Sequence, residues 1–281
     1  MLSRSLAPDM APEAIAAVDR RLADIRAAHG VAIPFAIESG SRAWGFPSPD
    51  SDYDCRFIYV QPPERYLSLW PARDVIETPI EGDLDVNGWN LAKAIRLLLN
   101  GNAVAIEWLT SPIAYGVDER FRAAFLAFAE QAADRDRVAR HYRGLGYAHQ
   151  ERHLREGEPI ALKKLFYMVR PAAALRWLRL RPDAAVAPMR FQTLMAECDP
   201  PPAVARIMDD LIARKAVTRE LGAAMAPAEI LAFLAQEFRL ADETFGRRAP
   251  RLKAGERERA DRFFRDMLDH VWRERPNRDM G

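Results

Sequence analysis

The first 118 residues alternate between strand-like apolar runs and helical segments. Apolar residues recur every three or four positions over 11–29, which predicts a helix that ends at Gly30. Short runs rich in β-branched and aromatic residues predict four strands. These strands are expected at residues 31–38, 53–60, 75–80 and 83–89. Residues 40–52 are rich in Gly, Ser, Pro and Asp, so we expect a loop between the first two strands.

From about residue 119 onward the pattern becomes that of successive amphipathic helices. They are expected at roughly 119–150, 159–181, 188–197, 203–221, 227–246 and 252–274. Pro171 should kink or break the second of these, because proline lacks the N–H donor of a helix interior. Strands first and helices afterwards predict an α+β fold, with one domain over residues 1–118 and an all-helical C-terminal domain over 119–281.

Composition supports a soluble globular protein. Hydrophobic residues make up 49% of the 281 positions and charged residues 29%, which allows a sizeable core and argues against disorder. The net charge of +1 hides an uneven distribution, because residues 1–118 hold 10 Lys and Arg against 16 Asp and Glu, whereas 119–281 hold 31 against 24. An acidic first part suits a metal site and a basic second part suits phosphate binding. An arginine-rich helical surface would give the same balance.

The cysteines and the apolar runs bear on the compartment. Cys55 and Cys198 form no CxxC pattern, so neither a zinc site nor a disulfide framework is expected. No apolar stretch approaches the roughly 18 residues of a membrane span, and the first residues lack a signal-peptide core. We therefore expect a reduced, cytoplasmic protein with no membrane partner.

Three aspartates form the first candidate for chemistry. Asp52 and Asp54 lie one residue apart at the start of an expected strand, so their side chains share one face. Asp85 lies on another expected strand between Leu84 and Val86, and it joins the pair if the two strands are adjacent. Clustered carboxylates repel each other, and a divalent cation relieves that repulsion. Hard oxygen ligands suit Mg²⁺ or Mn²⁺, and three carboxylates can hold two such ions.

A Gly-Ser pair precedes the aspartates. Gly40 and Ser41 follow an expected strand, ten residues before the Asp52–Asp54 pair. Glycine lets the backbone approach a phosphate closely, and serine adds a hydroxyl donor. Gly-Ser alone indicates a turn, and Asp-x-Asp alone is common on surfaces. Their conjunction, with a further aspartate on a later strand, predicts a catalytic site.

The helix expected after residue 159 carries a second candidate. Lys163, Tyr167 and Arg170 share one helical face, at steps of four and three. Cations of this kind bind phosphates, and an aromatic ring between them can contact a base or sugar. The alternative is an amphipathic helix with a solvated basic edge. His149 and His153 have a spacing that suits zinc, but the glutamate of the metalloprotease pattern does not follow His149.

The run from Gly40 through Gly45 to Ser51–Asp54 resembles the GS…DxD signature of the DNA polymerase β-like nucleotidyltransferases. More narrowly, the chain is similar to the predicted nucleotidyltransferases of the YcgL/RlaP type, the latter linked to bacterial RNA-repair operons. The supporting segments are 39–60, 85–102, 107–112 and 163–177. That family has the pattern DxxGWD where this chain has Asn90, so an acidic role there is in doubt, whereas a helix-capping role survives.

The resemblance implies an N-terminal mixed β-sheet flanked by helices, with Mg²⁺ (or Mn²⁺) on Asp52, Asp54 and Asp85. It implies transfer of a nucleoside monophosphate from an NTP such as ATP to a hydroxyl acceptor, with release of pyrophosphate. The residues we expect to bind the nucleotide are Gly40, Ser41, Arg42, Lys163, Tyr167 and Arg170. RNA or tRNA, as in RNA repair, a protein and a small molecule remain open as acceptors. The alternative function is a catalytically silent sensor module that binds nucleotide or RNA.

Overall fold

The computed structural model describes residues 2–246, 252 and 254–273. Its centre is a six-stranded mixed sheet in the order β1-β6-β2-β3-β5-β4. β3 and β5 are parallel, and the other neighbours are antiparallel. The strands are β1 (Ser3–Ser5), β2 (Ala32–Glu38), β3 (Tyr53–Val60), β4 (Val75–Glu77), β5 (Leu84–Asn90) and β6 (Ala114–Val117). The predicted α+β fold is thereby confirmed.

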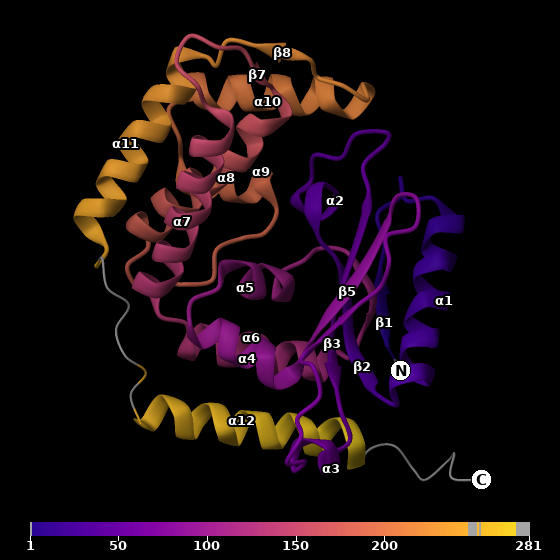
Figure 1. The fold of residues 1–281 in the computed structure, drawn as a ribbon. Coiled ribbons are helices and arrows are strands. Elements are labelled where there is room, and N and C mark those ends of the chain that lie inside the picture. The colour runs from indigo at the N-terminus through magenta and orange to yellow at the C-terminus, as the bar shows by residue number, and fades with distance from the viewer. Residues whose placement is uncertain (1, 247–251, 253, 274–281) are drawn as a thin grey trace.

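One face of the sheet is covered by α1 (Pro12–His29), which lies alone on that side (Figure 1). Its apolar stripe of Val18, Leu22 and Ile25 packs with alternate residues of β3, among them Cys55 and Phe57. Successive side chains of a strand point to opposite faces. Asp54 and Arg56, which alternate with the buried residues of β3, therefore face away from α1.

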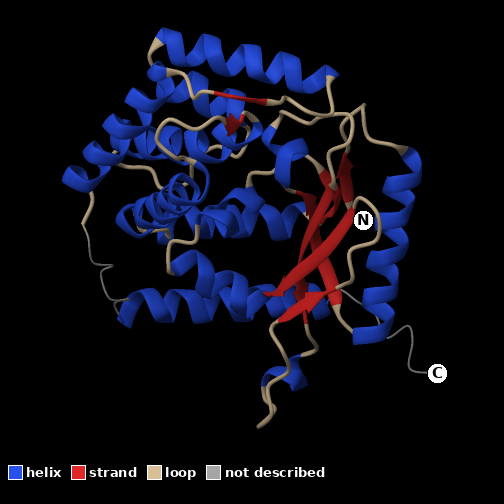
Figure 2. Cartoon of the chain, turned by 45° about the horizontal axis from the view of Figure 1, so that its top comes forward, coloured by secondary structure: helices blue, strands red, loops and turns tan. Residues whose placement is uncertain are grey.

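Helices α4, α5, α6 and α12 lie on the opposite side of the sheet (Figures 1 and 2). They span Leu91–Leu99, Ala103–Leu109, Glu119–Ala132 and Ala254–Arg273. The N-terminus of α4 is capped as expected, because the Asn90 side chain accepts a hydrogen bond from Ala92 N. α12 packs against α4 and α6, so the last described helix returns to the layer beside the sheet. The domain boundary at residue 118/119 remains a prediction.

The remaining long helices form a bundle around α8 (Lys163–Leu180), which packs against α7, α9 and α11. Most of the side chains of α8 are buried, and its core is continuous with that beside the sheet. The other members of the bundle are α7 (Arg135–His153), α9 (Phe191–Cys198), α10 (Pro202–Val217) and α11 (Ala228–Thr244). The helical bundle and the sheet therefore share one hydrophobic core.

Several local predictions were wrong. The expected helix 119–150 divides after Ala132, because the Asp134 side chain caps a new helix by accepting from Arg137 N. Pro171 does not break α8, since burial against three neighbouring helices outweighs the one missing hydrogen bond. The end of the expected helix 252–274 lies outside the described residues.

Short elements were also missed. The expected loop 40–52 begins with the five-residue helix α2 (Gly40–Trp44), and α3 (Pro63–Tyr66) follows β3. The predicted all-helical part contains a two-stranded pair, β7 (Ile160–Ala161) with β8 (Ala223–Ala224). No helix in the described part of the chain is both long and apolar enough to cross a membrane. Cys55 and Cys198 are buried free thiols.

Candidate active site

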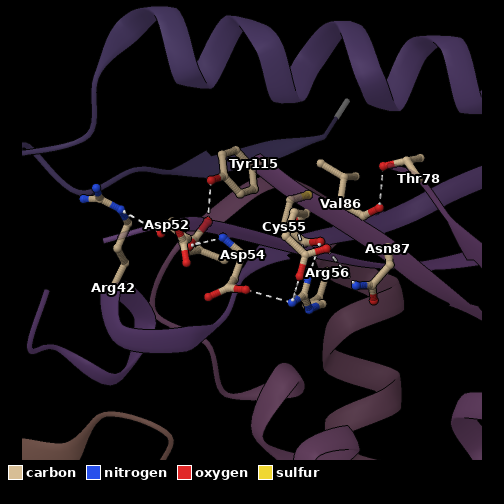
Figure 3. Close-up of polar contacts among 11 residues, drawn as sticks. Arg42, Asp52, Asp54, Cys55, Arg56, Thr78, Val86, Asn87 and Tyr115 are labelled. Carbon is tan, nitrogen blue, oxygen red and sulfur yellow. Dashed lines mark hydrogen bonds and ion pairs between the residues drawn. The ribbon is translucent and has the colours of Figure 1, made fainter. Parts of the chain in front are cut away.

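The parallel pairing of β3 and β5 places two of the predicted aspartates side by side. Asp54 lies directly opposite Asp85 in the register of the two strands. Their carboxylates share one cation. Arg56 Nη2 lies 2.8 Å from Asp54 Oδ1 (Figure 3). The same nitrogen lies 2.7 Å from Asp85 Oδ2. The expectation that these strands are adjacent is confirmed. The arginine between the two carboxylates was not anticipated.

Asp52 immediately precedes β3, and its side chain is exposed. The loop that carries it is held by Arg42, whose Nε and Nη2 donate to the main-chain oxygens of Asp52 at 3.2 Å and Ser51 at 2.8 Å. The Arg42 guanidinium also lies over the Tyr53 ring, 4.1 Å from its centre. Arg42 is buried and is not among the residues that line the neighbouring cleft, so its contact with the nucleotide stays a prediction.

Glu38 is hydrogen-bonded to the backbone of Asp54. This residue ends β2 and is fully buried. Its Oε1 accepts a hydrogen bond from Asp54 N at 2.8 Å, and its Oε2 accepts one from the Tyr115 hydroxyl. Burial raises the pKa of Glu38 to about 7, more than the two hydrogen bonds lower it. Sequence reasoning missed Glu38, although an acid at the end of the apolar run 31–37 was a signal that it has an internal partner.

The pKa of Asp54 is raised as well. Burial is the largest cause, and the negative charges of Asp85 and Asp52 add to it, whereas Arg56 opposes it. Burial and the neighbouring carboxylates thus disfavour the charged form of Asp54 even with Arg56 in place.

A cleft with a volume of about 320 Å³ opens between the loop after β2 and the helical bundle. Asp50, Asp52 and Asp54 line its side toward the sheet. Four cations line its other side: Lys163 and Lys164 from α8, Lys215 from α10, and Arg219. The cleft is also lined by Gly40, Ser41, Trp44 and Tyr167. An acidic wall therefore faces a basic wall across a space of small-molecule size.

The three residues predicted to share a face of α8 lie in two different environments. Lys163 and Tyr167 reach the cleft. Arg170, one turn further on, is buried beneath it, with Nη2 2.6 Å from Glu107 Oε1 and its guanidinium 4.2 Å from the centre of the Trp44 ring. Arg170 is thus placed to join α8 to α5, and its expected contact with a nucleotide is not supported.

Lys215 joins the loop that follows α2 to the helical bundle. Its Nζ donates to Phe46 O at 2.7 Å, and Gln192 Nε2 donates to Gly45 O from α9. Burial lowers the pKa of Lys215 to about 8, although the Asp50 carboxylate acts in the opposite direction. Lys215 and Arg219 were missed because they are distant in sequence from the rest of the site.

The residues present suit an oxygen-bound divalent cation only in part. Among the described residues, no group of three His, Cys, Asp or Glu side chains is close enough to hold a metal. Asp52 and Asp54 line the cleft and have the hard oxygen donors that Mg²⁺ prefers. Asp85 does not line it, because its Oδ1 accepts from Asn87 Nδ2 at 3.2 Å and its Oδ2 accepts from Arg56. Two of the three expected ligands therefore line the cleft, and metal binding by the three aspartates stays a prediction.

A Gly-Ser segment, an Asp-x-Asp strand and an aspartate on the adjacent strand of a mixed sheet are features of the polymerase β-like class. The chain belongs to the RNA repair pathway DNA polymerase beta family, which matches residues 14–266. It is also 36% identical over 255 residues to a Bacillus subtilis (strain 168) protein described as uncharacterized protein YcgL. That alignment covers 89% of this chain and 95% of the relative. The resemblance inferred from the sequence is confirmed, and the family suggests nucleotidyl transfer.

Proposed function

We propose that this protein transfers a nucleoside monophosphate from a nucleoside triphosphate to a hydroxyl acceptor and releases pyrophosphate. The observation that carries the proposal is a cleft of about 320 Å³. Asp52 and Asp54 line it from the side of the sheet, and four cations line it from the helical bundle. A triphosphate is the kind of ligand that needs both walls. Its negative charge binds the cations, and its metal ion binds the carboxylates.

The helical bundle supplies the charge for phosphate binding. Lys163 and Lys164 come from one part of the chain, Lys215 and Arg219 from another, and all four line the cleft. Opposite them, Gly40 and Ser41 offer a close backbone approach and a hydroxyl donor. The Tyr167 ring, which packs edge-on against Trp44, provides an aromatic surface for the base or sugar.

Asp52 and Asp54 are the residues we assign to hold Mg²⁺ or Mn²⁺. When bound, such an ion neutralises negative charge on the triphosphate and on the leaving pyrophosphate. The acceptor oxygen attacks the α-phosphorus, and the bond from phosphorus to the leaving oxygen breaks. Asp54, a partly buried carboxylate that lines the cleft, is the one we assign to take the hydroxyl proton. Glu38 holds the backbone of Asp54 in place.

RNA is the acceptor we propose to test first. The family description refers to an RNA repair pathway. On the α7 side of the cleft, the ring of Tyr167 stacks on His149 with centroids 5.3 Å apart, and His149 stacks on His153 at 6.0 Å. Planar side chains next to Lys164, whose Nζ lies 5.3 Å from the centre of the Tyr167 ring, suit an RNA end.

A catalytically silent sensor is the second candidate. One observation favours it: Arg56 and Asn87 already occupy the oxygens of Asp85, so the third carboxylate is not offered to a metal. A sensor would bind nucleotide in the same cleft and release no pyrophosphate.

The test is incubation with each α-labelled NTP, Mg²⁺ or Mn²⁺, and pooled tRNA, total RNA and cell protein. We expect label in an RNA pool, and none with Asp54→Asn or Asp52→Asn, both of which should fold as the unmodified chain does. Label in the protein pool would redirect the acceptor assignment. Metal-dependent NTP binding without label or pyrophosphate in any pool would support the sensor, and undiminished transfer by either variant would overturn the site assignment.

A further inference from the structure

Arg56 lies between the carboxylates of Asp54 and Asp85. On β3 it is two residues after Asp54, so both side chains project from the same face. On the neighbouring strand, Asp85 pairs with Asp54 and Asn87 pairs with Arg56. The guanidinium folds back along the strands to the two carboxylates, and this geometry depends on the parallel register of β3 and β5.

The contacts of Arg56 are numerous for one side chain. Nη2 is shared between Asp54 Oδ1 and Asp85 Oδ2, at 2.8 and 2.7 Å. Nη1 donates to the main-chain oxygens of Asp85 at 3.0 Å and Cys55 at 3.2 Å. The side chain of Arg56 is only 15% exposed, and those of Asp54 and Asp85 are 27% and 28% exposed. A guanidinium held by two carboxylates and two carbonyls is a fixed part of the site.

Asp54 and Asp85 differ in how many of their carboxylate oxygens accept hydrogen bonds from Arg56 and Asn87. Both oxygens of Asp85 are engaged, Oδ2 by Arg56 and Oδ1 by Asn87. Asp54 uses only Oδ1 in this pair, and its Oδ2 lies against Gly40, which lines the cleft. Asp54 Oδ2 therefore accepts no hydrogen bond from Arg56 or Asn87, whereas each oxygen of Asp85 already accepts one of theirs.

Charge balance agrees with this division. Ionised Asp52, Asp54 and Asp85 carry three negative charges, and the Arg56 guanidinium cancels one of them. The remaining two match a single divalent ion. A second divalent ion beside Arg56 would place like charges within a few ångströms in a partly buried site, which is strongly unfavourable.

We infer that Arg56 replaces one of the two metal ions for which three carboxylates provide, so that the site binds one divalent cation, at Asp52 and Asp54. Asp85 then acts through Arg56 as a positioning residue and is not a metal ligand. This inference rests on the proposed function, because it assumes that the carboxylates serve a metal-dependent site.

The experiment counts Mn²⁺ bound to the full chain by the loss of the free-ion electron paramagnetic resonance signal, without nucleotide. We expect one ion for the unmodified chain and one for Asp85→Asn. Arg56→Met should bind two, because it frees the oxygens shared by Asp54 and Asp85, and Arg56→Met combined with Asp85→Asn should return to one. Arg56→Lys keeps the positive charge and should stay at one, with circular dichroism reporting the folding of each variant.

Two ions on the unmodified chain, or loss of the ion in Asp85→Asn, would overturn the inference and leave the proposed transfer intact. A folded Arg56→Met that still binds one ion would also overturn it. If Arg56→Met does not fold, the Asp85→Asn count decides. No Mn²⁺ on the folded, unmodified chain would overturn both this inference and the proposed metal dependence. One bound ion without any nucleotidyl transfer would overturn the proposed function alone.

Discussion

Gly40 and Asp54 lie so close together that no side chain fits between them. A β carbon on Gly40 would overlap Asp54 Oδ2. Gly40 also has a φ of +58°, a left-handed conformation that costs other residues about 1–2 kcal/mol. Glycine at this position therefore allows α2 to begin and leaves space for the carboxylate.

Gly40→Ala should displace the Asp54 carboxylate and lower nucleotidyl transfer on the order of 100-fold, because small misplacements of reacting groups are costly. Gly82→Ala is the matched control. Gly82 has the same φ of +58°, but nothing lies within 4 Å of a β carbon there. Gly82→Ala should lose a free energy of unfolding similar to that lost by Gly40→Ala, as measured by urea unfolding, and should keep its activity. Equal losses of activity in the two variants would show that backbone strain is the cause.

Lys215 should make nucleotide binding depend on pH. Its pKa is about 8 in the free protein, where burial and Lys163 and Arg42 oppose its charge and Asp50 favours it. Only the charged form attracts phosphate, so the Kd of a non-hydrolysable NTP should be about tenfold weaker at pH 9 than at pH 7. Fluorescence titration measures this.

Two variants separate Lys215 from the other cations of the cleft. Lys215→Met should bind more weakly at pH 7 and show little further loss up to pH 9. Lys163→Met removes a cation that pairs with Glu220 at 3.3 Å on the exposed rim. It should weaken binding at neutral pH and move the pH dependence to higher pH, because the Lys163 charge lowers the pKa of Lys215. The assignment to Lys215 fails if Lys215→Met retains the pH dependence.

Glu38 should make the free energy of unfolding fall as the pH rises, whereas an ion-paired acid makes it rise. Its pKa rises from 4.5 to about 7 on folding, so the folded protein holds this proton more tightly than the unfolded chain does. The resulting stabilisation is fully present below pH 4.5 and is lost as the pH rises through 7. The rise corresponds to about 3 kcal/mol.

Glu38→Gln removes that titration and can keep the hydrogen bonds to Asp54 N and Tyr115. Between pH 4.5 and 8, the free energy of unfolding of the unmodified chain should therefore fall by about 3 kcal/mol relative to the variant. Urea unfolding at several pH values measures the difference. Parallel stability curves for the two proteins would contradict the prediction.

Arg170 should matter for stability and not for nucleotide affinity. It pairs with Glu107 at 2.6 Å, and both side chains are less than 10% exposed. Arg170→Met leaves the Glu107 carboxylate buried without its cation, which should cost about 3–5 kcal/mol in denaturant unfolding. Arg239→Met, at an exposed pair with Glu243, should change stability by less than about 1 kcal/mol. A weakened nucleotide Kd with little loss of stability in Arg170→Met would restore the sequence-based prediction.

The sequence by itself determined the fold class, the strands that carry Asp54 and Asp85, and the cap at Asn90. These features depend on residues within a few positions of one another, through side-chain periodicity and local hydrogen bonds. The same local rules failed where packing decides, as at Pro171 inside the buried α8. The division between α6 and α7 was also missed, although the Asp134 cap that begins α7 is a local signal.

Only the tertiary structure decided which residues meet. Arg56 contacts a carboxylate 29 residues away, and Lys215 contacts a carbonyl 169 residues away. Arg170 was predicted to bind nucleotide from its place on a helical face, and Arg42 from the family resemblance, but neighbouring residues bury both side chains. The pKa of Glu38 depends on exclusion of water by the sheet and its covering helices. Desolvation and long-range ion pairing arise only when distant segments pack together, so no pattern along the chain encodes them in a readable form.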